Sequence, residues 1–220
     1  MRKKTHLIGM TAFVLAVVAV QLLASACHRE YYLTQLIVAA YYSIVALGLC
    51  LVMGYAGQIS LGHGAFFAIG GYTSAVLTTL DLGKLANTDF GQLLCRLRFL
   101  VPRQDLYGGE FVGVSPPAAF VIAILLTVVT ALAIGYPALR LKGHYLAMAT
   151  LGFGLIVYRI LVGSEFTGGA DGISSVPNWH LLPGLVICEK NGMRLQNYYF
   201  AWVVVGVTLI FILKLVNSRV

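Results

Sequence analysis

The sequence predicts an all-α integral membrane protein with about six transmembrane helices, and three observations support this fold class. Hydrophobic residues make up 59% of the 220 residues and charged residues only 10%, whereas soluble domains carry about 25% charged residues. The mean hydropathy is +0.86. The apolar residues also gather in separate runs, each about long enough to cross a bilayer as a helix. We therefore expect a single membrane domain over residues 1–220.

The first two predicted spans lie at 7–26 and 33–53. Three basic residues, Arg2, Lys3 and Lys4, precede the first span. Ala24, Ser25 and Ala26 before Cys27 also resemble a cleavage site, so removal of the first span as a signal peptide is the alternative interpretation. Either interpretation places Cys27 outside the cytoplasm.

The remaining spans are separated by two long polar segments, at 81–116 and 163–197. Pro116 and Pro117 mark the start of the fourth span, because proline is tolerated at the first positions of a helix. Pro137 is expected to break the chain after it. Tyr198 and Trp202 suit a membrane interface at the last span. The four later spans are predicted at 60–80, 118–134, 144–162 and 198–215.

The third span follows a glycine-rich polar turn and contains small residues at regular spacing. Ser60, Gly64 and Ala68 recur every four positions, which on a helix makes a flat stripe that another helix backbone can approach. Gln58, Ser60 and His63 place polar groups at one end of that stripe. Such groups face protein or a wet cavity when they lie within a membrane. The pattern therefore indicates either a tightly packed helix pair or a helix that lines a solute path.

Two sequence blocks carry a resemblance to a known family. SLGHGAFFAIGGY at 60–72 resembles the SLGHxAFxxxGAY segment of LivM-type branched-chain amino acid ABC permeases. The second block is PALRLKGHYLAMATLGFG at 137–154, followed by TGGADGI at 167–173. The resemblance implies an ABC importer permease fold and transport of leucine, isoleucine or valine. It also implies a second, LivH-like permease, two cytoplasmic ATPase subunits and a periplasmic amino-acid-binding protein as partners.

Other classes of function fit the sequence less well. The chain has no G-x-x-x-x-G-K-[ST] loop for ATP and no H-E-x-x-H or C-x-x-C motif for zinc, so we expect no catalytic residue, cofactor or metal. Its basic residues are scattered, which argues against nucleic-acid binding. A permease for urea or short-chain amides, a non-ABC channel and a structural membrane subunit stay open as alternatives.

The candidate site residues form two groups. Every acidic residue maps to a loop, which favours a path for a neutral or zwitterionic solute over an ion pump. The residues expected to line the translocation path or to pack helices are Gln58, Ser60, His63, Gly64, Tyr72, Thr73, His144 and Thr150. The expected outer gate or docking element is a glycine-rich turn that contains Thr167, Gly168, Gly169, Asp171 and Gly172.

Charge fixes the expected orientation in the inner membrane. With the amino terminus in the cytoplasm, the short inner segments hold basic residues and no acids, as the positive-inside rule requires. These basic residues are Arg2, Lys3, Lys4, Arg140, Lys142, Lys214 and Arg219. The two long polar segments then lie outside, where a Cys95–Cys188 disulfide or two unpaired thiols are both open possibilities.

The resemblance implies that family members continue beyond the last residues here, LKLVNSRV. We therefore expect the sequence to be the amino-terminal portion of a longer, truncated permease. The cytoplasmic loops between its spans are too short for a docking helix. The resemblance implies that the loop that docks on the ATPase follows the last span. The expectation is a chain that inserts into the membrane without coupling to ATP.

Overall fold

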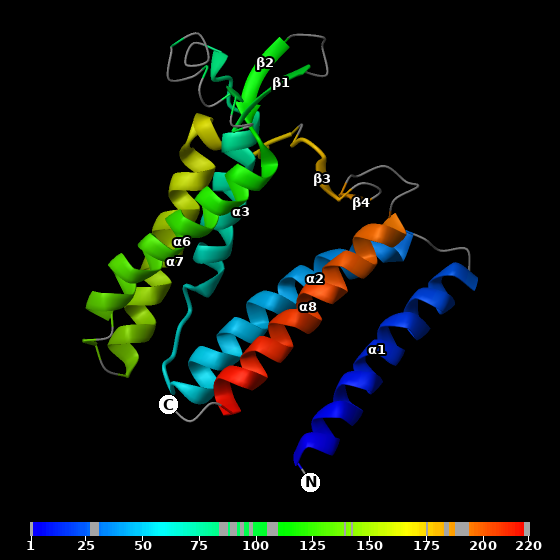
Figure 1. Ribbon diagram of the computed structural model, residues 1–220. Helices are drawn as coiled ribbons and strands as arrows, with labels where there is room; N and C mark the ends of the chain where they lie inside the picture. The colour runs from blue at the N-terminus through cyan, green and yellow to red at the C-terminus, as the bar shows by residue number, and fades with distance from the viewer. Residues whose placement is uncertain are drawn as a thin grey trace. The chain divides into compact units, whose positions relative to one another are not determined.

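A computed structural model shows a mainly helical chain (Figure 1). The residues it describes are 2–26, 31–83, 88, 92, 95–96, 99–104, 110–138, 140–141, 143–174, 176–182, 185–187 and 194–217. The contacts divide the chain into two units. Unit 1 combines Met1–Leu51 with His180–Val220, and unit 2 is Val52–Trp179.

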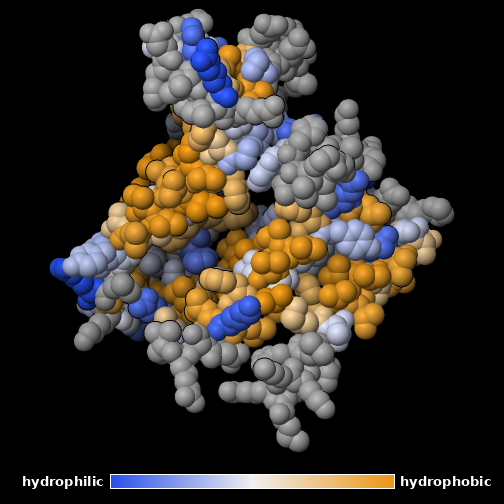
Figure 2. Space-filling view, in the orientation of Figure 1, coloured by the Kyte–Doolittle hydropathy of each residue, from blue (hydrophilic) through white to orange (hydrophobic). Residues whose placement is uncertain are grey.

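The predicted all-α membrane fold is confirmed. Within the described residues, five segments are long and apolar enough to cross a membrane: Gly9–Ala26, Tyr31–Tyr55, Pro116–Ala138, His144–Gly163 and Arg194–Val216. A further helix, α3 (His63–Thr79), has 17 residues, which places it at the lower limit of spanning length, about 26 Å. Apolar residues cover much of the helix surface in view, as contact with lipid requires (Figure 2).

Unit 1 contains α1 (Arg2–Ala26), α2 (Tyr31–Cys50) and α8 (Arg194–Asn217). Helices α2 and α8 pack side by side through a buried cluster of Ala40, Ala201 and Val205. Alanine allows this close approach because small side chains let two helix backbones come together in lipid. Helix α8 begins at Arg194, four residues before the predicted start of the last span.

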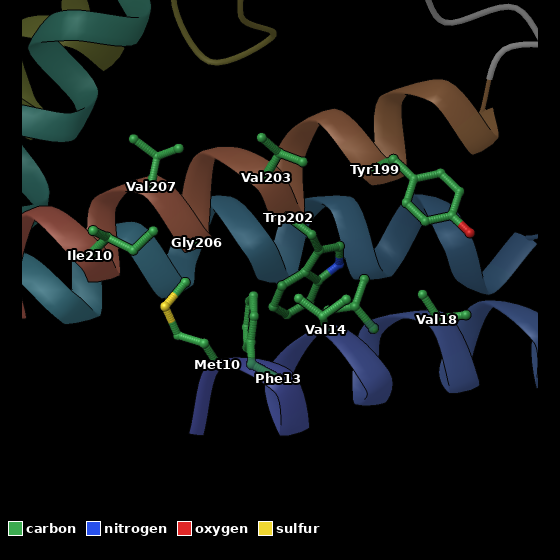
Figure 3. A pocket seen from close by; sticks show the side chains of 11 residues that line it. Met10, Phe13, Val14, Val18, Tyr199, Trp202, Val203, Gly206, Val207 and Ile210 are labelled. Atoms are coloured by element: carbon green, nitrogen blue, oxygen red, sulfur yellow. The ribbon is translucent and has the colours of Figure 1, made fainter. Parts of the chain in front are cut away.

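Helices α1 and α8 meet through aromatic side chains. The Tyr198 hydroxyl donates to the Val17 carbonyl at 2.9 Å, and the rings of Phe13 and Trp202 lie 5.8 Å apart. An apolar groove of about 280 Å³ runs between the two helices, and Met10 and Phe13 extend from α1 toward α8 along it (Figure 3). A second bond runs from the Tyr199 hydroxyl to the Gln21 side chain at 3.1 Å, so aromatic contact and two interhelical hydrogen bonds join α1 to α8.

Unit 2 is built on α3, α6 (Pro116–Ala138) and α7 (His144–Gly163). Its hairpin end is the end where α3 stops and α6 starts. Its turn end lies where α6 stops and α7 starts. Pro137 does not break α6 ahead of itself, and the helix continues to Ala138. Proline lacks the N–H for one helical hydrogen bond, and this close to the helix end the loss does not stop the helix.

Two hairpins interrupt the predicted polar segments. Strand β1 (Leu100–Gln104) pairs antiparallel with β2 (Glu110–Val114), and β3 (Trp179–Leu182) pairs with β4 (Leu185–Ile187). The first hairpin packs on the end of α3 and the start of α6, where Leu100, Val114 and Ala119 are buried together. The sequence analysis treated both segments only as polar loops.

Candidate functional site

The site begins where the chain leaves the second span. Helix α2 passes directly into a short π-helix, η1 (Leu51–Tyr55). Gly57 follows with a φ of 63°, and the Gln58 amide donates to the Val52 carbonyl at 3.2 Å. A left-handed glycine commonly ends a helix, and the bond from Gln58 to Val52 closes the last turn of η1. The predicted glycine-rich turn is thus confirmed, and it turns the chain toward α3.

Residues 58–62 are not helical, and they lie against α7. The Leu61 amide donates to the Thr150 hydroxyl at 3.0 Å, while that hydroxyl donates to the Ala147 carbonyl at 3.0 Å. A Cβ on Gly62 would overlap the Thr150 carbonyl oxygen, and a Cβ on Gly154 would lie 3.6 Å from the Gly62 Cα. Two backbones therefore touch at Gly62.

The prediction that the stripe of Ser60, Gly64 and Ala68 receives a neighbouring backbone is wrong within unit 2. A Cβ on Gly64 would meet nothing within 4 Å. The helix starts only at His63, so Ser60 precedes it and the four-residue spacing does not describe one helical face. The close approach occurs at Gly62, two residues earlier.

A cavity of about 370 Å³ lies between this non-helical segment, α6 and α7. It brings together four of the predicted path residues, Gln58, Ser60, His63 and Thr150, all half-buried. Apolar side chains form most of the remaining wall, which also includes Thr127: Val52, Ile59, Phe66, Val128, Ala131, Ile134, Ala138, Leu146 and Phe153. The cavity thus has a polar edge and an apolar wall.

The cavity lies within membrane depth. Thr150 comes six residues after the start of α7 at His144, which is about 9 Å along the helix. On the other side, Ile134 and Ala138 of the last turns of α6 line the same space. Non-helical backbone at such depth is tolerated only where it is buried in protein or lines a wet cavity. Residues 58–62 therefore occupy a position that membrane proteins reserve for such cavities.

Among the described residues that line the cavity there is no Asp, Glu, Lys or Arg, so its electrostatics come from dipoles. Helix α3 starts at the cavity edge, and its N-cap residue Gly62 supplies no side-chain hydrogen bond. The partial positive charge of a helix N-terminus therefore acts on this space. With the amide, hydroxyl and imidazole groups, this arrangement can solvate a neutral or zwitterionic solute.

The other predicted path residues lie elsewhere. Gly64 and Tyr72 line a second groove, of about 420 Å³, between α3 and α7, opposite Gly154 and Tyr158. His144 is the exposed first residue of α7, and Thr73 lies within α3. Neither Thr73 nor His144 lines the cavity or this groove.

The predicted glycine-rich turn after α7 is confirmed as a turn. Gly168, Gly169 and Gly172 all have positive φ, at 76°, 59° and 75°. Thr167 is nearly buried, and its hydroxyl donates back to the Leu161 and Ser164 carbonyls. Asp171 is exposed. Ile173, at the end of this turn, lies beside Gly71 and Tyr72 of α3.

The structure adds residues that the sequence analysis did not single out. Thr127 of α6 lines the cavity, and its hydroxyl lies 3.3 Å from where a Cβ on Gly70 would be. The rings of Phe66 and Phe153 pack at 5.2 Å across the cavity wall. A polar residue in the middle of an apolar span was the available signal for Thr127. The aromatic pair joins two distant segments and gave no local signal.

The cysteine prediction stays a prediction, because Cys188 is outside the described residues. Cys95 is half-buried beside the first hairpin, and Cys50 is exposed at the end of α2. Within the described residues there is no cluster of three or more His, Cys, Asp or Glu side chains that could hold a metal ion.

Comparison with known proteins relates the chain to membrane transport proteins. A family model described as "Branched-chain amino acid transport system / permease component" matches residues 31–220. The chain is 37% identical over 137 residues to the high-affinity branched-chain amino acid transport system permease protein LivM of Escherichia coli. The LivM protein of Salmonella typhimurium matches to the same extent. The match covers 62% of this chain but only 25% of each LivM protein. No solved structure matches.

Proposed function

Because the chain belongs to the family of branched-chain amino acid transport system permease components, we propose that it is a permease subunit of an ABC importer for leucine, isoleucine and valine. The observation that carries the proposal is the cavity around Gln58, Ser60, His63 and Thr150, which forms part of the translocation path. A second, LivH-like permease completes that path. Two cytoplasmic ATPase subunits drive it, and a periplasmic binding protein delivers the solute.

The make-up of the cavity supports an amino acid with an aliphatic side chain. Binding sites of this kind combine a mostly apolar wall with a few polar groups that fix orientation. The polar edge suits the ammonium and carboxylate of a zwitterion, while Ile134, Leu146 and Phe153 suit a branched side chain. Urea has no apolar group, so it would make no apolar contact with this wall. The cavity therefore favours branched-chain amino acids over the urea alternative.

The proposal includes the orientation and the outer face. Charge places the amino terminus and the turn end of unit 2 in the cytoplasm, so the first hairpin and the turn at 167–172 face the periplasm. The turn at Thr167, Gly168, Gly169, Asp171 and Gly172 is the proposed gate or docking element for the binding protein. Its glycines hold a defined shape, as a contact surface for another protein requires.

Uptake of radiolabelled leucine by the assembled transporter tests the proposal. Isoleucine and valine should compete with it, and urea should not. Replacing Gln58 by Leu should raise the leucine concentration for half-maximal uptake by about two- to tenfold, since one lost hydrogen bond costs about 0.5–1.5 kcal/mol. Thr130→Val is the matched control, because the Thr130 hydroxyl bonds the Leu126 carbonyl of its own helix and lies outside the cavity lining.

Two results would reject the proposal. If urea uptake depended on this chain while leucine uptake did not, the amide permease alternative would replace it. If Gln58→Leu and Thr130→Val gave the same uptake curve as the unmodified protein, the cavity would not be part of the path.

A further inference from the structure

The non-helical segment 58–62 is held at both ends. The left-handed turn at Gly57 holds one end, and the first turn of α3 at His63 holds the other. In between, the described residues show one hydrogen bond from this segment to α7, from the Leu61 amide to the Thr150 hydroxyl. That bond joins residues 89 positions apart in the sequence.

We propose that Thr150 is a positioning residue, whose hydroxyl holds segment 58–62 against α7 and thereby keeps Gln58, Ser60 and His63 around the cavity. The proposal rests on the proposed function for the identity of the solute. The geometry of the segment is independent of that identity.

The hydroxyl is oriented for this role. It donates its proton to the Ala147 carbonyl one turn earlier on α7. A hydroxyl has one proton and two lone pairs, so its lone pairs stay available for the Leu61 amide. The hydrogen bond inside α7 therefore fixes the direction of the acceptor that the non-helical segment meets.

Gly62 makes the contact possible. Any larger residue there would push the segment away, because its Cβ would overlap the Thr150 carbonyl oxygen. Gly154, one turn further along α7, receives the Gly62 backbone in the same way. Two features of α7 thus hold segment 58–62: the Thr150 hydroxyl, and the backbone at Gly154, which no side chain covers.

Thiol labelling measures the position of the segment directly. A reporter cysteine replaces Ser60 in a chain whose four native cysteines are serine, and inside-out vesicles are treated with a membrane-impermeant maleimide. Thr150→Val keeps the shape of the side chain but removes the hydroxyl, so labelling should become about fivefold faster, as expected for losing one hydrogen bond. Thr150→Ser keeps the hydroxyl and should label at the original rate.

The control and a second variant keep the test decisive. Thr130→Val removes a hydroxyl that bonds only its own helix, so it should leave labelling unchanged. Gly62→Ala keeps the Thr150 hydroxyl but displaces the segment sterically, so it should accelerate labelling as Thr150→Val does. If Thr150→Val did not insert into the membrane, Gly62→Ala would still decide the outcome.

Uptake kinetics, measured without the reporter cysteine, separate positioning from general damage. Thr150→Val should raise the half-saturating leucine concentration more than it lowers the maximal rate, and Thr150→Ser should restore both. Unchanged labelling of Ser60→Cys in Thr150→Val would overturn the inference, whatever the solute and whatever Gly62→Ala shows. Faster labelling in a protein that transports no branched-chain amino acid would uphold the inference and reject the proposed function.

Discussion

Glycine has a distinct role at each of three positions in this chain. Gly57 closes η1 in a left-handed conformation, Gly62 allows two backbones to touch, and Gly168 combines a positive φ with a close contact. Gly64 has open space where its side chain would be. Sequence spacing drew attention to Gly64, whereas a close backbone contact selects Gly62, and a positive φ together with a close contact selects Gly168.

Gly168→Ala should destabilise the turn after α7. Its φ is 76°, and a Cβ would overlap the Gly172 carbonyl oxygen, so we expect a cost of about 1–3 kcal/mol. Thermal unfolding of the purified protein in detergent measures it. Gly163→Ala is the matched control, because a Cβ there meets nothing within 4 Å. Equal unfolding temperatures for the two variants would contradict the assigned conformation.

Tyr198→Phe should weaken the attachment of α1 to α8. Tyr198 is 1% exposed, and its hydroxyl donates to the Val17 carbonyl. Interhelical hydrogen bonds in membranes average about 0.6 kcal/mol, so the unfolding free energy should fall by about that amount. Hydrogen exchange of the α1 amides should become faster. Tyr199→Phe, which loses a bond to the Gln21 side chain on the exposed surface, should change exchange less. Slower or unchanged exchange in Tyr198→Phe would show that the bond does not hold α1.

At the scale of elements, the first hairpin is bound to the chain just after α3. The Leu82 amide donates to the Val112 carbonyl at 2.8 Å, and the Asp81 carboxylate accepts from the Gly83 and Val112 amides. These bonds join the residues just beyond the end of α3 to strand β2. The hairpin and the helix end therefore form one packed structure.

Gly113→Val should separate the hairpin from α3. A Cβ on Gly113 would lie 2.7 Å from the Thr78 carbonyl oxygen, so the strand must move, at a cost of about 1–3 kcal/mol. Limited proteolysis should then cut the 81–116 segment faster. Gly71→Ala on α3, where a Cβ meets nothing within 4 Å, should keep the original cleavage rate. If Gly113→Val were cut no faster than Gly71→Ala, the hairpin would not depend on this contact.

The sequence was most informative about the long helices and least informative about short elements. Apolar runs identify α6 and α7 because only a helix satisfies its backbone inside lipid. The first hairpin was missed because its strands have five residues each, too few for a periodic pattern inside a charged segment. The glycines Gly108 and Gly109 between the strands were the available turn signal.

The site was predictable only in part for a related reason. Gln58, Ser60 and His63 are neighbours in the chain, so local polarity was enough to group them. Thr150 was named as a candidate because it lies in the sequence block at 137–154. Only the fold shows that it lies against Leu61. The sequence did not reveal that residues 58–62 are non-helical, because Ser60 shares the four-residue spacing of Gly64 and Ala68 in α3. Thr127 and Phe153 reach the cavity through packing, which no local pattern records.

At the scale of the whole molecule, orientation is the property that charge predicts and labelling can test. Single cysteines at Leu141, on the turn end, and at Phe99, on the hairpin end, are both at exposed positions. With the amino terminus in the cytoplasm, an impermeant reagent added to intact cells with a permeable outer membrane should label Phe99→Cys and not Leu141→Cys. Disrupting the inner membrane should make both react, which serves as the control. The reverse pattern in intact cells would invert the topology.

The shortness of α3 has a consequence for the lipid around the protein. Its 17 residues cover about 26 Å, a few ångströms less than a hydrocarbon core of about 30 Å. Residues 58–62, which precede α3, are not helical, so this part of the chain has no helical hydrogen bonds of its own. A thicker bilayer would therefore strain this segment before it strained any helical hydrogen bond. Hydrophobic mismatch would then act directly on the cavity wall, so that acyl-chain length itself would tune how the cavity holds its solute.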